Sequence, residues 1–295
     1  MKRSCLLTAI ATLFLSTFAD SAGITLTSPA EQPPSKPEPQ REQRTKPRDN
    51  HVDLRFYGFG ENFEWKETMD GQRLLKESGP IFGVGGDIAA PLSDPFWIEA
   101  RGEFFLGDVD YDGHIQHEDG RLTPHKSTTS YIGFRLEGDL AIHVPINRQL
   151  YARPFFGLGF RGWTRTLGGK LSSNAIEEGG YEEHWLLAYA IIGISGGIAL
   201  NEKTTLFIRT ETRLPLNNSE TVDLSSAGGP DDVEIEPGKE ASLYAEAGII
   251  ASRLTASLFV ETLHFSESDP DENYRAFLQP ESDSTMFGLK VGLAF

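Results

Sequence analysis

The chain has 295 residues, enough for one large domain or two small ones, and its 43 acidic residues against 27 Lys and Arg give a net charge of −16. A chain this acidic repels nucleic acid, so we exclude that class of partner. The single cysteine, Cys5, lies in a segment that we expect to be removed, which excludes disulfides, cysteine-ligated metals and cysteine catalysis from the mature protein.

The N-terminus is typical of a secretory signal peptide followed by a linker. Lys2 and Arg3 precede an apolar run that ends at Phe18, and small residues lead to an expected cut after Ser21. Residues 22–50 hold six prolines among Glu, Gln, Lys and Arg, a composition that cannot bury enough apolar surface to fold. We therefore expect a signal peptide at 1–21, a disordered linker at 22–50 and one domain over 51–295.

From residue 51 onward, apolar residues recur at every second position. In TSYIGFRLEGDLAIHV, residues 129–144, Ile132, Phe134 and Leu136 share one parity, while Arg135 and Glu137 share the other. Ten such segments occur, near 52–66, 80–91, 96–108, 129–144, 150–166, 184–200, 203–214, 241–251, 253–266 and 284–295. A soluble β-sandwich shows the same alternation, but its strands are shorter and its turns come every 8 to 12 residues or so.

The connections between these segments alternate between short and long. Short links occur at 91–95, 145–149 and 201–203 and around Ser252, whereas long ones occur near 67–79, 109–128, 167–183, 215–240 and 267–283. An even number of strands with short turns at one end and long loops at the other is typical of a transmembrane antiparallel up-and-down β-barrel. The sequence therefore predicts an all-β barrel of about ten strands, with short periplasmic turns, long acidic extracellular loops and both termini in the periplasm.

The last segment, MFGLKVGLAF, ends the chain on an aromatic residue. Its odd-numbered positions are all apolar and are expected to face lipid: Phe287, Leu289, Val291, Leu293 and Phe295. This ending resembles the closing strand of outer-membrane β-barrel proteins of Gram-negative bacteria. The resemblance implies a place in the outer membrane among lipid and lipopolysaccharide, a monomer, and an assembly signal that the barrel-assembly machinery recognises.

The other face of the segments is charged. We expect the following side chains to face the lumen and to pair across strands, because the interior of a barrel of this size is narrow enough for side chains to fill: Arg55, Asp87, Glu99, Arg101, Glu103, Arg135, Glu137, Asp139, Arg153, Arg161, Arg209, Glu211, Arg213, Glu246, Glu261 and Lys290. The alternative is a narrow polar pore that passes small solutes.

An Asp ladder marks the rim of the third segment, where Asp108, Asp110 and Asp112 alternate. Carboxylates in this pattern suggest a weak divalent-cation site for Ca²⁺ or Mg²⁺, with no other cofactor expected. The ten-stranded omptin proteases are similar in general plan and use rim acids opposite an Asp-His pair. Residues 214–223, LPLNNSETVD, offer no Asp-x-His, so the chain departs from that pattern.

These observations lead to a ranked set of functions. The first is a non-enzymatic outer-membrane barrel, similar in plan to the small barrels resembling outer-membrane protein A, with a structural or surface-interaction role. The second is a narrow passive channel. The third is a rim-sited hydrolase, either omptin-like or lipid-modifying.

Overall fold

The computed structural model describes residues 52–116, 122–172, 180–225, 233–270 and 278–295. The expected signal peptide and linker lie outside these residues. The described residues contain no helix that is long and apolar enough to cross a membrane.

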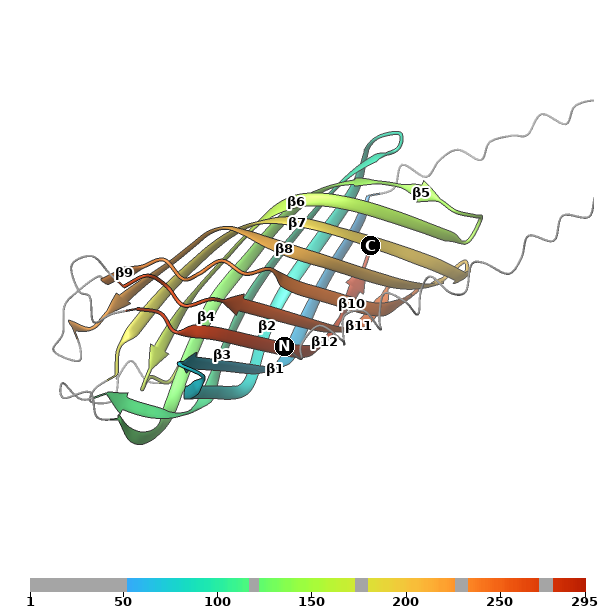
Figure 1. The fold of residues 1–295 in the computed structure, drawn as a ribbon. Coiled ribbons are helices and arrows are strands. Elements are labelled where there is room, and N and C mark those ends of the chain that lie inside the picture. Colours follow the sequence, from blue (N-terminus) through green and yellow to red (C-terminus); the bar gives the residue numbers. More distant parts are fainter. Residues whose placement is uncertain (1–51, 117–121, 173–179, 226–232, 271–277) are drawn as a thin grey trace, which may run out of the picture. The chain divides into compact units, whose positions relative to one another are not determined.

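Within the described residues, ten long strands form the wall of a barrel (Figure 1). They are β1 (Asp53–Met69), β2 (Gln72–Ser93), β3 (Phe96–Gln116), β4 (Leu122–Ile142), β6 (Leu150–Leu167), β7 (Glu182–Asn201), β8 (Thr204–Asp223), β10 (Ser242–Ala251), β11 (Leu254–Phe265) and β12 (Glu281–Ala294). Two short strands complete the sheet: β5 (Val144–Pro145) pairs with β6, and β9 (Val233–Ile235) pairs with the last residues of β8.

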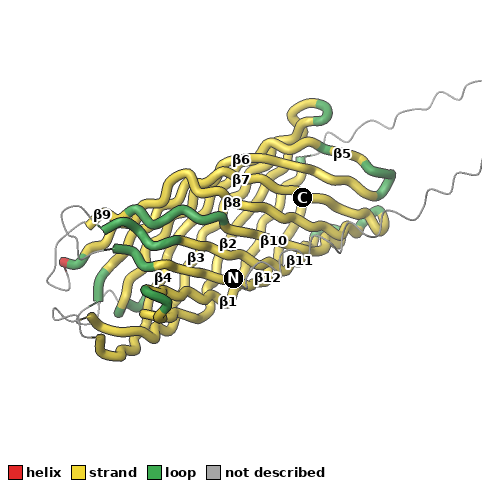
Figure 2. Tube along the Cα trace, in the orientation of Figure 1, coloured by secondary structure: helices red, strands yellow, loops and turns green. Residues whose placement is uncertain are grey.

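The sheet closes on itself. All the pairings are antiparallel, β10 joins β8, and β1 pairs with both β2 and β12. No long strand is therefore left with an open edge, which is the condition for a sheet to lie in lipid. The tube in Figure 2 is strand over most of its length. The predicted ten-stranded antiparallel barrel is confirmed.

The two faces of the wall differ as the alternation predicts. Large apolar side chains point outward, for example Val84, Phe156 and Leu258, each more than half exposed. Charged and aromatic side chains point inward, where Trp65, Glu261 and Lys290 are almost fully buried. This is the reverse of a soluble protein and fits an apolar solvent outside the barrel.

The strands extend further toward the long-loop end than their apolar pattern suggested. The expected loop at 67–79 is mostly strand, because β1 and β2 continue to a tight turn at Asp70 and Gly71, both with positive φ. The expected loop at 109–128 is also shortened by β3 and β4. Most outward residues in these extensions are polar, such as Lys76, with Leu74 and Leu122 as exceptions, so backbone pairing continues beyond the apolar belt although the outer face there largely suits water.

The closing strand lies as predicted. Phe287, Leu289, Val291, Leu293 and Phe295 are all exposed on the outer face. The Phe295 backbone N donates to the Leu54 carbonyl at 2.8 Å, and the Phe295 ring contacts the edge of Phe56. The last residue thus completes the seam between β12 and β1.

Candidate functional site

The sixteen charged residues expected in the lumen all lie in ion pairs in the structure. Eight are cationic and eight are acidic, and each has at least one partner of opposite charge within 4.0 Å. Fourteen of them form one connected set, which we call the central network. The pair formed by Arg55 and Asp87 stands apart from it.

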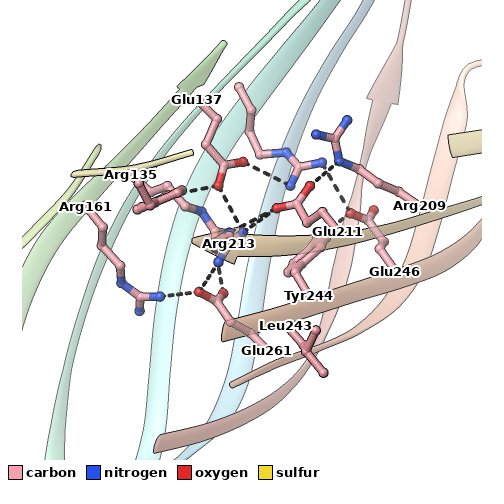
Figure 3. A network of polar contacts seen from close by, with 12 residues as sticks. Arg135, Glu137, Arg161, Arg209, Glu211, Arg213, Leu243, Tyr244, Glu246 and Glu261 are labelled. Atoms are coloured by element: carbon pink, nitrogen blue, oxygen red, sulfur yellow. Dashed lines mark hydrogen bonds and ion pairs between the residues drawn. The ribbon is translucent and has the colours of Figure 1, made fainter. Parts of the chain in front are cut away.

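Glu261 of β11 is the hub of the central network. It accepts hydrogen bonds from Arg135 and Arg213, both at 2.5 Å, and from Arg161. Figure 3 shows the guanidinium groups of Arg161 and Arg213 converging on the Glu261 carboxylate. Arg135 belongs to β4, which lies five places from β11 around the ten long strands. This contact therefore crosses the lumen from one wall to the opposite wall.

Other pairs cross the lumen nearer the short-turn end. Arg209 of β8 donates to Asp139 of β4 at 2.6 Å and to Glu99 of β3 at 3.1 Å. Lys290 of β12 donates to Glu103 of β3 at 2.7 Å. Since these strands are three or four places apart, the side chains fill the middle of the barrel instead of pairing only along the wall.

A cavity of about 620 Å³ opens at the short-turn end. Its walls carry charges of both signs and the aromatic residues Tyr151 and Phe207. Arg101, Arg209 and Glu246 line it and also belong to the central network. The cavity therefore meets the network as it enters the barrel.

A second buried group, which we call the outer cluster, lies near the long-loop end. Arg165 of β6 contacts Glu67 of β1 at 2.9 Å, Glu77 of β2 at 3.1 Å and Glu183 of β7 at 2.8 Å. The outward neighbours of these residues in the strands are polar, for example His184, which places the cluster beyond the apolar belt.

Neutral donors complete the outer cluster. Trp65 Nε1 donates to Glu67 at 2.9 Å and Trp185 Nε1 donates to Glu183 at 3.1 Å. Glu77 accepts from the hydroxyls of Thr129 and Tyr131. The indole of Trp163 stacks on that of Trp185, with ring centroids 5.2 Å apart. These indoles lie directly beside the outer cluster, two residues from Glu67, Arg165 and Glu183 on the same strands.

The carboxylates of the outer cluster are not among the lumen residues predicted from the sequence. Glu67 and Glu77 lie in a stretch expected to be a loop, and Glu183 lies at the edge of another. The signal that could have found them is the inward parity, which continues from Phe63 through Trp65 to Glu67 without a break.

The Asp ladder faces outward. Asp108, Asp110 and Asp112 are exposed on the outer face of β3, and Asp108 accepts a hydrogen bond from the Leu171 backbone N at 3.0 Å. Across the described residues, no three acidic or histidine side chains lie close enough to hold a metal ion. The structure therefore does not assemble these three carboxylates into a metal-binding group.

A histidine and an aspartate also meet on the outer face. His264 Nδ1 lies 2.6 Å from Asp283 Oδ1, and both side chains are about one third exposed. They belong to β11 and β12, whereas the Asp ladder is on β3. The two groups do not face each other across a cleft, as an omptin-like site requires.

No protein-family model matches the chain, and no curated protein matches it in sequence. Solved structures match it in fold. OmpT, the outer membrane protease of Escherichia coli, is 12% identical, with 83% of this chain and 96% of that chain covered and a TM-score of 0.50. The translocator domain of the autotransporter NalP from Neisseria meningitidis is 11% identical, covers 82% of this chain and 89% of its own, and has a TM-score of 0.38.

Ail, the attachment invasion locus protein of Yersinia pestis, is 10% identical over 83% of this chain and 99% of its own, with a TM-score of 0.30. Sequence identities this low show similarity of fold alone. The chain has the fold of the outer-membrane β-barrel proteins of Gram-negative bacteria.

Proposed function

We propose that the protein is a monomeric outer-membrane β-barrel with a structural or surface-interaction role and a lumen that does not conduct. The observation that carries this proposal is the central network, in which Arg135 of β4 reaches Glu261 of β11 across the lumen. Without an open path through the barrel, the protein's contacts with its surroundings are made by its outer wall and its ends.

The proposed orientation follows from the two ends of the barrel. Short turns face the periplasm, where the signal peptide would deliver the chain, and the acidic long-loop end faces the outside. The expected surroundings are outer-membrane lipid and lipopolysaccharide, with divalent cations shared between loop carboxylates and lipid phosphates. The closing strand would be recognised by the barrel-assembly machinery.

Electrostatics favour a plug over a pore. Opening a path would separate Glu261 from three guanidinium groups, and a buried charge without its partner costs about 3–5 kcal/mol. The contacts are also redundant, since Arg213 donates to Glu211 as well as to Glu261. Loss of one contact therefore leaves its guanidinium held by another.

A solute-flux experiment tests the proposal. Liposomes that contain the native protein should swell no faster in an isotonic solution of a small sugar than empty liposomes do. Liposomes that contain Arg135→Ala together with Glu261→Ala should swell faster, because both side chains of a lumen-crossing pair are removed. Rapid swelling with the native protein would reject the plug and favour the narrow channel.

The narrow channel is retained as a second candidate because of the cavity at the short-turn end. Its volume, about 620 Å³, lies within the usual range for pockets that hold small molecules. A rim-sited hydrolase is supported only by the hydrogen bond between His264 and Asp283. If replacement of Asp108 and Asp110 abolished a measured peptide or lipid turnover, the enzyme would become the first candidate.

A further inference from the structure

The outer cluster has too few cations for its carboxylates. Among the described residues, Arg165 contacts three of them, Glu67, Glu77 and Glu183, and a fourth, Glu220 of β8, lies in the same buried region. All four carboxylates are less than one tenth exposed. If every group were ionised, one positive charge would face four negative charges in a site that is largely shielded from water.

Glu220 is the member to which the described residues supply no ion-pair partner. Its side chain is 1% exposed, and in the described part of the chain its Oε2 atom is buried without a hydrogen-bond partner. The other three carboxylates each accept from Arg165 and from an indole or hydroxyl group. Glu220 is thus the carboxylate whose ionised form is least supported.

The groups that face Glu220 come from each neighbouring element. Glu183 on β7 and Glu67 on β1 repel a negative charge there, and Arg165 on β6 attracts one but is already bound to three carboxylates. On β9, the register partner of Glu220 is Ile235, which is apolar. A buried carboxyl group in such surroundings prefers its neutral form.

Burial and the neighbouring carboxylates raise the pKa of Glu220 well above its usual range. Glu220 lies beyond the apolar belt, because the last large apolar residue on the outer face of β8 is Leu216 and the outward neighbours Ser219 and Thr221 are polar. Water can therefore reach this region once the covering segment moves.

The covering segment is the cap, defined here as residues 233–239, whose strand β9 pairs with the end of β8, while that end of β8 stays paired with β7 in the wall. Its apolar contacts are few: Val222, Val233 and Ile235 form a small buried cluster. Its polar ties are the short backbone ladder between β9 and β8, the Gly238 backbone N to the Ser266 carbonyl at 2.9 Å, Asn218 Nδ2 to the carbonyls of Pro237 and Gly238, and Lys239 Nζ to the Leu216 carbonyl at 2.8 Å. A single buried charge is large in comparison with these contacts.

We propose that Glu220 is a proton-binding site, and that the proton it holds keeps the cap closed over the outer cluster. When the proton leaves, a fourth negative charge appears beside Glu183 and Glu67, and hydration of the new carboxylate favours movement of the cap into water. This inference goes beyond the proposed function and does not depend on whether the lumen conducts.

The dependence of cap closure on pH follows from the difference in the pKa of Glu220 between the closed and open states. The pKa of Glu220 is higher in the closed cap than in the open, hydrated state, so the stabilisation is fully present at low pH. It is lost as the pH rises through the pKa of the closed state. The cap should therefore open on the alkaline side.

Tryptophan emission can follow this transition, because three of the four tryptophans, Trp65, Trp163 and Trp185, pack in or beside the outer cluster. The full chain carrying Trp97→Phe, in detergent micelles, should show one change in emission as the pH is raised from acid to alkali, because the raised pKa of Glu220 places its ionisation on the alkaline side of a free carboxyl group. Glu220→Gln should abolish the change, since the amide matches the neutral acid in shape but does not ionise.

The matched control is Glu234→Gln, which makes the same substitution at an exposed position of β9. It should keep the transition. Absence of a transition in the parent, its persistence in Glu220→Gln, or its loss in both variants would overturn the proposal. Folding of each variant is checked by the heat-dependent mobility shift of barrels on gels.

A labelling experiment gives an independent readout. Val233→Cys places a thiol at a cap position that is 1% exposed. At one alkaline pH, maleimide should label it about tenfold faster with Glu220 present than with Glu220→Gln, because labelling follows the open population. Because both proteins are compared at the same pH, the intrinsic ionisation of the thiol does not affect the ratio of the two labelling rates. Equal rates would contradict a cap held by the Glu220 proton.

Discussion

The central network and the outer cluster are both buried inside one barrel, yet they differ in charge balance. Among the lumen residues named from the sequence, eight cations meet eight acids and every side chain has an ion-pair partner. In the described part of the outer cluster, one guanidinium serves three carboxylates and a fourth has none. The first arrangement can fill a lumen permanently, whereas the second needs a proton.

The largest effect should come from the hub of the balanced region. Glu261→Ala leaves Arg135, Arg161 and Arg213 without their shared carboxylate, so we expect the free energy of unfolding to fall by about 3–5 kcal/mol. Urea titration of the folded barrel in micelles measures it. The exposed Glu234→Ala should change it by less than about 0.5 kcal/mol. Equal values for the two variants would mean that the central network is not held as a unit.

The unbalanced region should respond to pH after a single substitution. Arg165→Ala removes the guanidinium of the outer cluster, and we expect a loss of about 2–3 kcal/mol at neutral pH. Burial already raises the pKa of Glu183, and loss of the cation raises it further. Stability that depends on a raised pKa is present at low pH and is lost as the pH rises, so the variant should recover toward pH 5.

Unfolding midpoints at pH 5 and pH 8 measure this recovery. Arg148→Ala, at an exposed position near the short-turn end, is the control and should show no added dependence on pH. A deficit in Arg165→Ala that is the same at both pH values would show that the two regions do not differ in charge balance.

The closing strand tests the wall that surrounds both regions. Deletion of Phe295 removes its backbone contacts with Leu54 and its ring contact with Phe56, which should lower stability by about 1 kcal/mol. Assembly into the membrane should fall more than this change implies, because the terminal residue is expected to belong to the assembly signal. The amount of folded barrel in isolated outer membranes measures the efficiency of assembly. Normal assembly of the truncated chain would contradict a role of Phe295 in the assembly signal.

The smallest effect should come from charges outside the barrel. Glu64 contacts Lys66 and Lys76 on the outer face of β1 and β2, and their hydrogen bonds lower the pKa of Glu64. A lowered pKa gives stability that is present near neutral pH and is lost in acid. Glu64→Gln should therefore cost less than about 0.5 kcal/mol at pH 7, and the cost should shrink as the pH falls through the lowered pKa of Glu64, measured by urea titration. A cost as large as that of Glu261→Ala would remove the contrast between buried and exposed pairs.

The sequence allowed the ten strands and the inward charges to be predicted because lipid imposes a strict alternation on the wall. Arg135, Glu137 and Asp139 alternate with Phe134, Leu136 and Leu140, and that pattern has one interpretation in a closed sheet. Which carboxylate meets which guanidinium could not be predicted, since Arg135 and Glu261 are 126 positions apart and meet only through barrel closure.

The outer cluster was missed for a different reason. Where β1 and β2 leave the apolar belt, the outer face becomes polar, so both faces carry polar residues and the alternation no longer marks a strand. Glu67 and Glu77 therefore resembled loop carboxylates, although the backbone pairing of Glu67 with Leu75 continues there. The cap formed with β9 depends on three short-strand residues, which carry too little pattern to be recognised.

Single-channel recording in planar lipid bilayers tests the closed lumen most directly. The native protein should give no channel events, and Arg135→Ala combined with Glu261→Ala should give them, because that pair spans the lumen between β4 and β11. Steady conductance of the native protein would contradict a lumen filled by the central network.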